Sequence, residues 1–204
     1  MIRSGRADTM RIGVLALQGD FALHARALEK CGVEAVEVRK PVELDQVDGL
    51  VMPGGESTTL LKLMAAWDFV PALEKLHGAG KPIFGTCAGL ILLAREVESP
   101  KQLSLGLIDV TVVRNAYGRQ RESFEASGTA KLGPDPSQLE MVFIRAPRIK
   151  RVGPGVQVLA EHGGEPVMAR QDRVLVATFH PELTDSTKVH RYFCDLVERS
   201  RAGA

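Results

Sequence analysis

The sequence has few of the features that define several large protein classes. Only three of its 204 residues are cysteines, and no pair is spaced as C-x-x-C, so we expect neither a disulfide framework nor a metal site. No apolar run approaches the roughly 18 residues of a membrane helix. The formal net charge is +1, which argues against nucleic acid or a membrane surface as the main partner.

The start of the chain also lacks the apolar segment of a secretory signal. A second methionine, Met10, precedes the first apolar run. We therefore expect residues 1–9 to be a disordered extension and residues 10–204 to form a single domain. Hydrophobic residues make up 45% of the chain, enough for a substantial core. The protein is expected to be cytoplasmic and soluble.

In the first half of the chain, short apolar runs alternate with segments of helical spacing. This alternation predicts an α/β fold with a mostly parallel central sheet and helices on both faces. The expected strands are 11–17, 34–38, 49–52 and 81–84, and the expected helices run from Phe21 to Gly32, over 60–67, over 69–76 and from Leu90.

The second half contains short strand-like runs separated by turn residues. Gly163-Gly164 and Gln171-Asp172 are typical of hairpin tips. We expect antiparallel additions to the sheet and one strand that returns to it. Residues 127–137 are interpreted as a loop, and residues 187–199 as an amphipathic helix. The expected strands are 107–113, 140–144, 156–161, 167–170 and 173–179.

The motif Gly85-Thr86-Cys87-Ala88-Gly89 joins an expected strand to an expected helix. It is the cysteine counterpart of the G-x-S-x-G elbow, whose tight turn exposes a nucleophile above the sheet. The glycines are needed because side chains would collide with a neighbouring strand or helix. A helix start supplies free N–H groups that favour a thiolate and a nearby oxyanion. The alternative is a structural cysteine in a glycine-rich turn.

A cysteine nucleophile needs a base, and the base needs an orienting group. Of the five histidines, only His180 follows a buried strand and precedes Pro-Glu, which places it at the same sheet edge as Cys87. Glu182 can accept a hydrogen bond from its imidazole. The alternative is a histidine that only caps a strand. The remaining histidines lie in expected helices or beside glycines, namely His24, His77, His162 and His190.

A second glycine-rich turn, Pro53-Gly54-Gly55-Glu56-Ser57, also follows a strand. Its backbone can approach a ligand closely and supply a second oxyanion donor from Gly55 beside the Ala88 N–H. Equally, the turn can be a helix N-terminus capped by Ser57 or Thr58. It is not a Walker loop, because no Gly-Lys-Ser/Thr follows.

Taken together, these turns resemble class I, triad-type glutamine amidotransferases. The resemblance is closest to one branch, the glutaminase subunits of two-component pyridoxal 5′-phosphate synthases, and it extends from about Met10 to Arg199. The segments that carry it are Leu15–Gly19, Pro53–Thr59, Gly85–Gly89, Arg114–Gln120, Phe143–Pro147 and Thr178–Thr184.

The resemblance implies a role for each matching residue. Cys87 would be the nucleophile, with His180 and Glu182 as its relay. Gln18 would contact a partner subunit, although it could simply cap the first strand. For the two arginines of the substrate site, a solvated surface position is the alternative. Free glutamine carries a carboxylate and an ammonium, which suit Arg and Glu. The residues that would hold it are Gly54, Gly55, Glu56, Arg114, Ile144 and Arg145.

The implied activity is hydrolysis of L-glutamine to glutamate and ammonia. The ammonia would pass, in a hetero-oligomer, to the subunit that makes pyridoxal 5′-phosphate. The chain itself would need neither metal nor cofactor. Three alternatives stay open: a glutaminase for another synthase, such as imidazole glycerol phosphate synthase; a different cysteine hydrolase; and a catalytically silent docking subunit.

Overall fold

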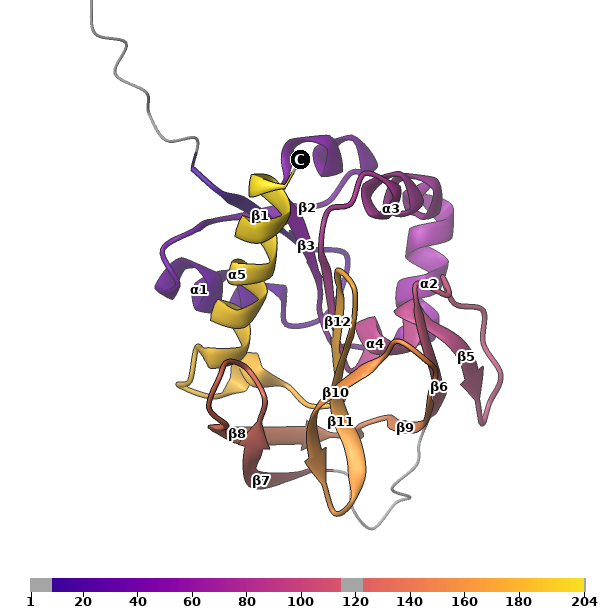
Figure 1. Cartoon of the computed structure of the whole chain (residues 1–204). Coiled ribbons are helices and arrows are strands. Elements are labelled where there is room, and N and C mark those ends of the chain that lie inside the picture. Colours follow the sequence, from indigo (N-terminus) through magenta and orange to yellow (C-terminus); the bar gives the residue numbers. More distant parts are fainter. Residues whose placement is uncertain (1–8, 115–122, 204) are drawn as a thin grey trace, which may run out of the picture.

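The computed structural model describes residues 9–114 and 123–203. Helices and strands follow one another throughout this part of the chain (Figure 1). In order they are β1 (Arg11–Leu15), α1 (Phe21–Lys30), β2 (Glu34–Val38), the 3-10 helix η1 (Pro41–Gln46), β3 (Gly49–Met52), α2 (Ser57–Ala66), α3 (Phe69–Gly78), β4 (Ile83–Thr86), α4 (Ala88–Leu93), β5 (Ala94–Glu98), β6 (Ile108–Val113), β7 (Ser123–Ala130), β8 (Ser137–Ile144), β9 (Arg148–Val152), β10 (Gln157–His162), β11 (Glu165–Gln171), β12 (Val174–Ala177), the 3-10 helix η2 (Pro181–Leu183) and α5 (Lys188–Ala202).

The main sheet has nine strands in the order β2-β1-β3-β4-β12-β11-β10-β7-β8. The first five of these pair in parallel, and the rest are antiparallel. Parallel strands place their carboxyl ends at one edge, where ligands of open α/β sheets bind. The predicted parallel sheet is therefore confirmed, and it brings the turns after β1, β3, β4 and β12 to a common edge.

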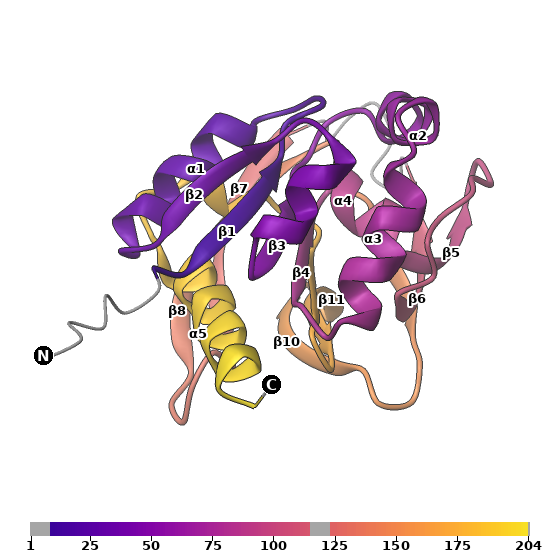
Figure 2. The same cartoon turned by 90° about the horizontal axis from the view of Figure 1, so that it is seen from above.

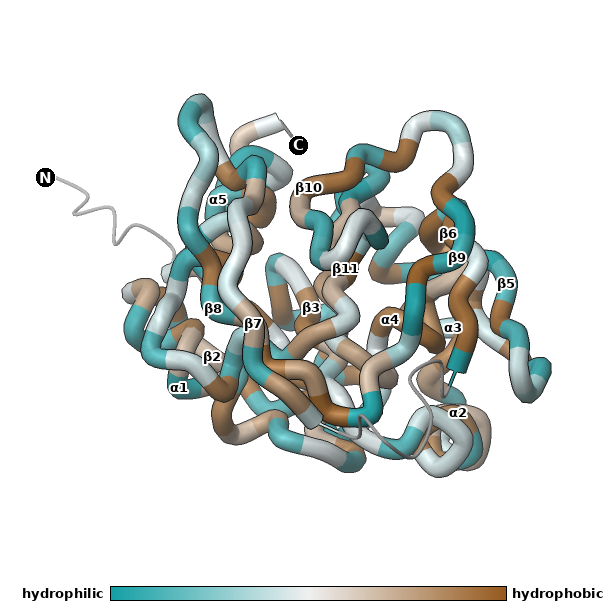
Figure 3. The backbone as a smooth tube through the Cα atoms, turned by 90° about the horizontal axis from the view of Figure 1, so that it is seen from below, coloured by the Kyte–Doolittle hydropathy of each residue, from teal (hydrophilic) through white to brown (hydrophobic). Residues whose placement is uncertain are grey.

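Two hydrophobic cores lie on the two faces of the parallel strands, and Figure 2 shows the helices that cover each face. Helices α1 and α5 pack on one face, and α2, α3 and α4 pack on the other. All six residues of α4 are buried, and this helix appears brown in the interior in Figure 3. Helix α4 thus fixes the turn that precedes it. In the described part of the chain, no helix combines the length and apolar character needed to cross a membrane.

Residues 94–171 form an insertion between α4 and β12. The hairpins β7–β8 and β10–β11 extend the main sheet, and β5, β6 and β9 form a separate three-stranded sheet. The expected antiparallel additions, the returning strand β12 and the hairpin tip at Gly163-Gly164 are confirmed.

Several expectations for this insertion need correction. The predicted loop 127–137 is wrong at both ends, because β7 continues to Ala130 and β8 begins at Ser137. Long-range pairing with β8 overrides the turn-like composition of this segment. Strands β5 and β9 were not anticipated. Residues 1–8 of the expected extension lie outside the described residues, and so do residues 115–120 of the Arg114–Gln120 motif.

Candidate active site

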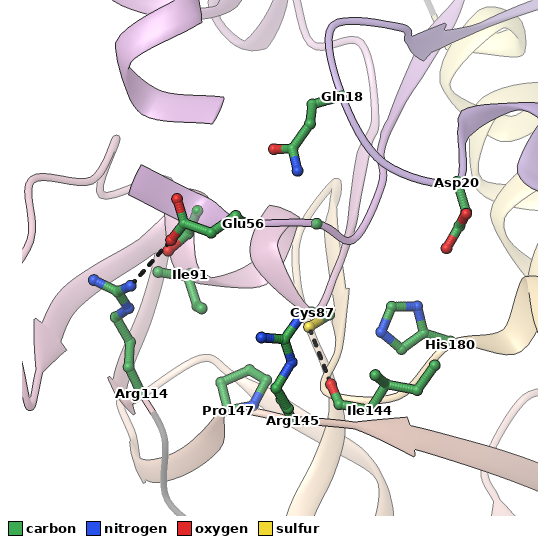
Figure 4. Close-up of a pocket in the computed structure, with 12 residues that line it drawn as sticks. Gln18, Asp20, Glu56, Cys87, Ile91, Arg114, Ile144, Arg145, Pro147 and His180 are labelled. Atoms are coloured by element: carbon green, nitrogen blue, oxygen red, sulfur yellow. Dashed lines mark hydrogen bonds and ion pairs between the residues drawn. The ribbon is translucent and has the colours of Figure 1, made fainter. Parts of the chain in front are cut away.

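A cavity of about 280 Å³ lies at the carboxyl edge of the parallel strands (Figure 4). This is near the lower end of the ~300–1,000 Å³ typical of small-molecule sites. It is bordered by the turns after β1, β3, β4 and β12 and by the end of β8. The lining residues are Gln18, Asp20, Gly55, Glu56, Ser57, Cys87, Ile91, Arg114, Ile144, Arg145, Pro147 and His180.

Cys87 lies on a sharp turn between β4 and α4. Its backbone has φ 46° and ψ −100°, a conformation that a residue with a Cβ rarely adopts. Its N–H donates to the carbonyl of Ala177 at 2.9 Å, which ties the turn to β12. A Cβ on Gly85 would lie 2.7 Å from the Gly89 carbonyl carbon, and one on Gly89 would lie 2.1 Å from the Met52 carbonyl oxygen. The expected need for both glycines is therefore confirmed.

His180 follows β12 and is held at both its backbone and its ring. Its N–H donates to the Val142 carbonyl of β8 at 2.8 Å, and its Nδ1 lies 2.8 Å from Glu182 Oε1. Both side chains are buried. The ring nitrogen Nε2 has no hydrogen-bond partner among the described residues. Because Nδ1–H faces the carboxylate, Nε2 is left to exchange a proton on the cavity side.

Cys87 and His180 come from distant parts of the sequence and lie beside one another in the cavity (Figure 4). Burial alone would lower the pKa of His180, but the neighbouring Cys87 and Glu182 outweigh it and raise the pKa to about 10. The Cys87 sulfur also lies 4.0 Å from the Ile144 carbonyl oxygen. The structure thus brings together the three residues expected to form a relay.

Glu56 begins helix α2 as its N-cap. Its carboxylate accepts hydrogen bonds from the backbone N–H groups of Thr58 at 3.2 Å and Thr59 at 2.7 Å. The pKa of Glu56 is lowered to about 2. The largest cause is the hydrogen bond from the Thr58 hydroxyl, which outweighs the opposite effect of burial. The glycine-rich turn is therefore also a helix N-terminus, as the alternative interpretation of the sequence expected, but its N-cap is Glu56 rather than Ser57 or Thr58. Arg114 reaches the same carboxylate at 3.4 Å.

The turn that contains Gly54 and Gly55 is enclosed on two sides. The Gln18 amide pairs with the Glu56 backbone, with its nitrogen 3.1 Å from the carbonyl oxygen and its oxygen 3.0 Å from the N–H nitrogen. On the other side, a Cβ on Gly54 would lie 2.4 Å from His180 Cε1. Gly55 has φ 145°, which glycine adopts readily. Gln18 therefore supports this turn from β1, a contact that its predicted role did not include.

The remaining candidates occupy different positions relative to the cavity. Ile144 ends β8, and Arg145 follows it with φ 42° and an exposed side chain. Ala88 is the first residue of α4, so its N–H has no acceptor within the helix. Of the residues expected to hold glutamine, only Gly54 is absent from the cavity lining, because it packs behind the turn against His180.

Sequence reasoning missed the surroundings of Glu182. His24 Nε2 lies 3.2 Å from Glu182 Oε2, and His24 Nδ1 lies 2.9 Å from His190 Nε2. A signal existed, since His24 is four residues before the buried Leu28 and therefore on the apolar face of its helix. Asp20 at the cavity edge was also missed.

Asp20, His180 and Glu182 form the one group in the described part of the chain whose ligand atoms could surround a metal ion, all within 4.8 Å of one another. Two of the three already bond to each other through His180 Nδ1 and Glu182 Oε1. Because Nδ1 of His180 is already engaged by Glu182, the geometry suits proton exchange better than metal binding.

The fold is that of class I glutamine amidotransferases. A crystal structure of a glutamine amidotransferase matches with a TM-score of 0.85 at 47% identity, covering 92% of this chain and 98% of that one. The structure of PurLQS from Thermotoga maritima shares the fold alone, with a TM-score of 0.68 at 16% identity over 96% of this chain and 98% of that one.

Residues 14–199 match the SNO glutamine amidotransferase family, and the chain belongs to this family. It is 50% identical to pyridoxal 5'-phosphate synthase subunit PdxT of Desulforudis audaxviator over 93% of this chain and all of that relative. The PdxT subunit of Koribacter versatilis is 53% identical, over 95% of this chain and 99% of its own length. The family resemblance expected from the sequence motifs is therefore confirmed.

Proposed function

We propose that this chain hydrolyses L-glutamine to L-glutamate and ammonia, and that it supplies the ammonia to a pyridoxal 5′-phosphate synthase subunit. The observation that carries the proposal is the position of Cys87 beside His180, whose other ring nitrogen is bonded to the buried Glu182. Full-length similarity to PdxT subunits supports both the reaction and the pathway.

The nucleophile forms when the Cys87 thiol proton passes to His180 Nε2, a transfer that the raised pKa of His180 favours before substrate binds. The sulfur then attacks the side-chain carbonyl carbon of glutamine and forms a tetrahedral adduct. Glu182 stabilises the imidazolium and fixes its orientation through the 2.8 Å contact to Nδ1. When the adduct collapses, the C–N bond breaks, His180 returns its proton to the departing amine, and a glutamyl thioester remains.

Water completes the cycle. His180, now neutral, removes a proton from a water molecule that attacks the thioester carbonyl. The C–S bond breaks, glutamate leaves, and the proton returns to the Cys87 sulfur. The oxyanion of both adducts would be stabilised by the backbone N–H of Ala88 and by that of Gly55 in the neighbouring turn.

Charged groups around the cavity suit free glutamine. Arg145 is exposed at the entrance and can pair with the α-carboxylate, as can Arg114, which lies beside Glu56. The Glu56 carboxylate is negatively charged at neutral pH, because its pKa is lowered to about 2, and this suits the α-ammonium. Ile144 and Gly54 would shape the remaining contacts.

The partner and the cellular location follow from the family and the composition. Ammonia released in free solution would be lost, so a glutaminase of this class would dock on the subunit that uses it. Gln18, at the edge of the cavity, is the residue that we assign to this contact. Three free cysteines are compatible with a reducing cytoplasm, the location expected from the sequence.

The test is glutamate release, measured for the chain alone and in complex with a pyridoxal 5′-phosphate synthase subunit. Cys87→Ala removes the nucleophile and should lower the rate at least about 10³-fold. Cys31→Ser is the matched control, because this cysteine is outside the cavity and should leave the rate unchanged. Retained activity in Cys87→Ala would exclude the covalent mechanism. Activation only by a different synthase would redirect the pathway.

A further inference from the structure

We propose that His24 is a positioning residue for the active site: it holds one oxygen of Glu182 so that the other oxygen faces His180. The inference rests on the proposed glutaminase function for its kinetic consequence, but its geometry is independent of substrate. It adds a member from helix α1 to a relay otherwise built from β4, β12 and η2.

The two oxygens of Glu182 face two different imidazoles. Oε1 lies 2.8 Å from His180 Nδ1, and Oε2 lies 3.2 Å from His24 Nε2. His24 Nε2 is equally 3.2 Å from the hydroxyl of Thr86, the residue before Cys87. Its N–H therefore lies between the hydroxyl and the carboxylate. Oε2 is buried without a well-directed hydrogen bond among the described residues, and its ion pair there is this contact with His24.

His190 on α5 sets the tautomer of His24. Burial and the neighbouring His24 lower the pKa of His190 to about 3, so His190 is neutral at physiological pH and carries one ring proton. Its Nδ1 is buried without a partner among the described residues, while its Nε2 lies 2.9 Å from His24 Nδ1. An unpartnered buried N–H is rarer than an unpartnered acceptor, so the proton belongs on His190 Nε2.

This assignment sets the direction of the whole chain of contacts. His190 Nε2–H donates to His24 Nδ1, and this keeps the His24 proton on Nε2, where it faces Thr86 and Glu182. With the opposite tautomer, a lone pair of His24 would face the carboxylate and repel it. The pair of histidines therefore presents a fixed donor to Glu182.

The surroundings of this cluster are dry and tightly packed. His24, His190 and Thr86 have no exposed surface. The ring of Phe84 meets both imidazoles edge-on, at centroid distances of 6.2 Å. Helix α1 also packs against α5 and η2. Electrostatic contacts are stronger in such surroundings than in water, and a misplaced carboxylate would find no solvent to replace them.

The effect on Glu182 agrees with this geometry. Burial alone would raise the pKa of Glu182, but His24 and His180 outweigh the burial and lower it. Glu182 lies on the short turn η2, so its side-chain orientation depends on these contacts rather than on a long regular element. Without His24, the carboxylate could rotate away from His180, and the imidazolium formed in the reaction would lose support.

The test compares three variants of the chain in complex with its synthase subunit. His24→Leu should lower kcat for glutamine hydrolysis about 10- to 100-fold with little change in KM, as expected for loss of one contact to a charged group. His24→Gln retains a donor near the Nε2 position and should recover much of that loss. Leu28→Ala is the control, because it opens a cavity on the same buried face of α1 and should leave kcat unchanged.

A second measurement needs no substrate. The proton on His180 Nδ1 should give a downfield NMR resonance in the wild-type chain, assigned by its absence from His180→Asn. The resonance should persist in Leu28→Ala and His24→Gln and should broaden or vanish in His24→Leu.

The outcomes separate this inference from the proposed function. If His24→Leu keeps the kcat of Leu28→Ala, or keeps the resonance, the positioning role is excluded. A wild-type chain without the resonance would contradict it as well. If the wild-type chain hydrolyses no glutamine but shows the resonance, and His24→Leu loses it, the proposed function fails and the positioning role stands.

Discussion

The parallel strands and the inserted segment contribute different kinds of residue to the same cavity. Cys87, His180 and Glu182 belong to turns after β4 and β12, within the parallel part. Arg114, Ile144 and Arg145 come from residues 94–171, the insertion between α4 and β12. The first group is buried, and the backbone N–H groups of Cys87 and His180 are hydrogen-bonded, whereas Arg145 lies exposed on a turn.

This difference indicates a division of work. The chemistry depends on tightly packed turns, since a Cβ on either glycine of the Cys87 elbow would clash with neighbouring backbone. The contacts proposed for the substrate depend on charged side chains at the rim. Substitutions at the Cys87 elbow and at His180 and Glu182 should therefore change folding and kcat, and those of the charged rim residues in the insertion should change KM.

The largest effect is expected where the elbow meets β3. Gly89→Ala places a Cβ 2.1 Å from the Met52 carbonyl oxygen, and backbone cannot move aside cheaply. We expect a loss of about 1–3 kcal/mol or more in unfolding free energy, seen as a lower Tm, together with loss of activity. Gly78→Ala is the control, because nothing lies within 4 Å of its Cβ. A Gly89→Ala protein as stable as the wild type would contradict the proposed tightness of the elbow.

A smaller effect is expected from the insertion. Arg145→Ala removes a charge from the cavity rim and should raise KM for glutamine about 10- to 100-fold, with a much smaller change in kcat. Steady-state kinetics of glutamate release measures both. Arg151→Ala is the control, since Arg151 pairs with Asp109 on the small sheet outside the cavity. A fall in kcat with constant KM would break the proposed division of work.

The smallest effect is expected at Glu56, where the two parts meet through Arg114. The folded-state pKa of about 2 is lower than the ordinary value of 4.5, so the carboxylate stabilises the fold above pH 4.5, and this stability is lost as the pH falls towards 2. Urea unfolding at several pH values should show a smaller fall in unfolding free energy between pH 4.5 and 2 for Glu56→Gln than for the wild type. Thr58→Val, which removes the first hydrogen bond, should shift the loss towards pH 4.5. An unchanged slope in Glu56→Gln would exclude this contribution.

The parallel part was predictable from sequence because its signals are local. Each strand that precedes a turn of the active site is an apolar run, and each of these turns carries glycine or proline at a position that the fold requires. The insertion was harder to predict. Strand β7 contains Gly128 among small polar residues and is stabilised by pairing with β8, which local composition does not reveal.

The contacts of His24 were hidden for a related reason. Its position on the apolar face of α1 could be read from its spacing to Leu28, but its partners lie on η2 and α5, more than 150 residues further along the chain. Only the packing of these elements shows that a buried histidine faces Glu182. Similarly, the pairing of Gln18 with the Glu56 backbone depends on the order of β1 and β3 in the sheet.

The bond between the His180 N–H and the Val142 carbonyl has a consequence for protein engineering. It joins main chain to main chain, so the amino acid at position 142 can change without breaking it. The neighbouring lining residues Ile144, Arg145 and Pro147 can therefore be randomised in a library of variants that keeps the nucleophile and the base unchanged. Such a library would be screened for altered substrate selectivity. Ammonia release from asparagine or longer amides would identify members with a new substrate range.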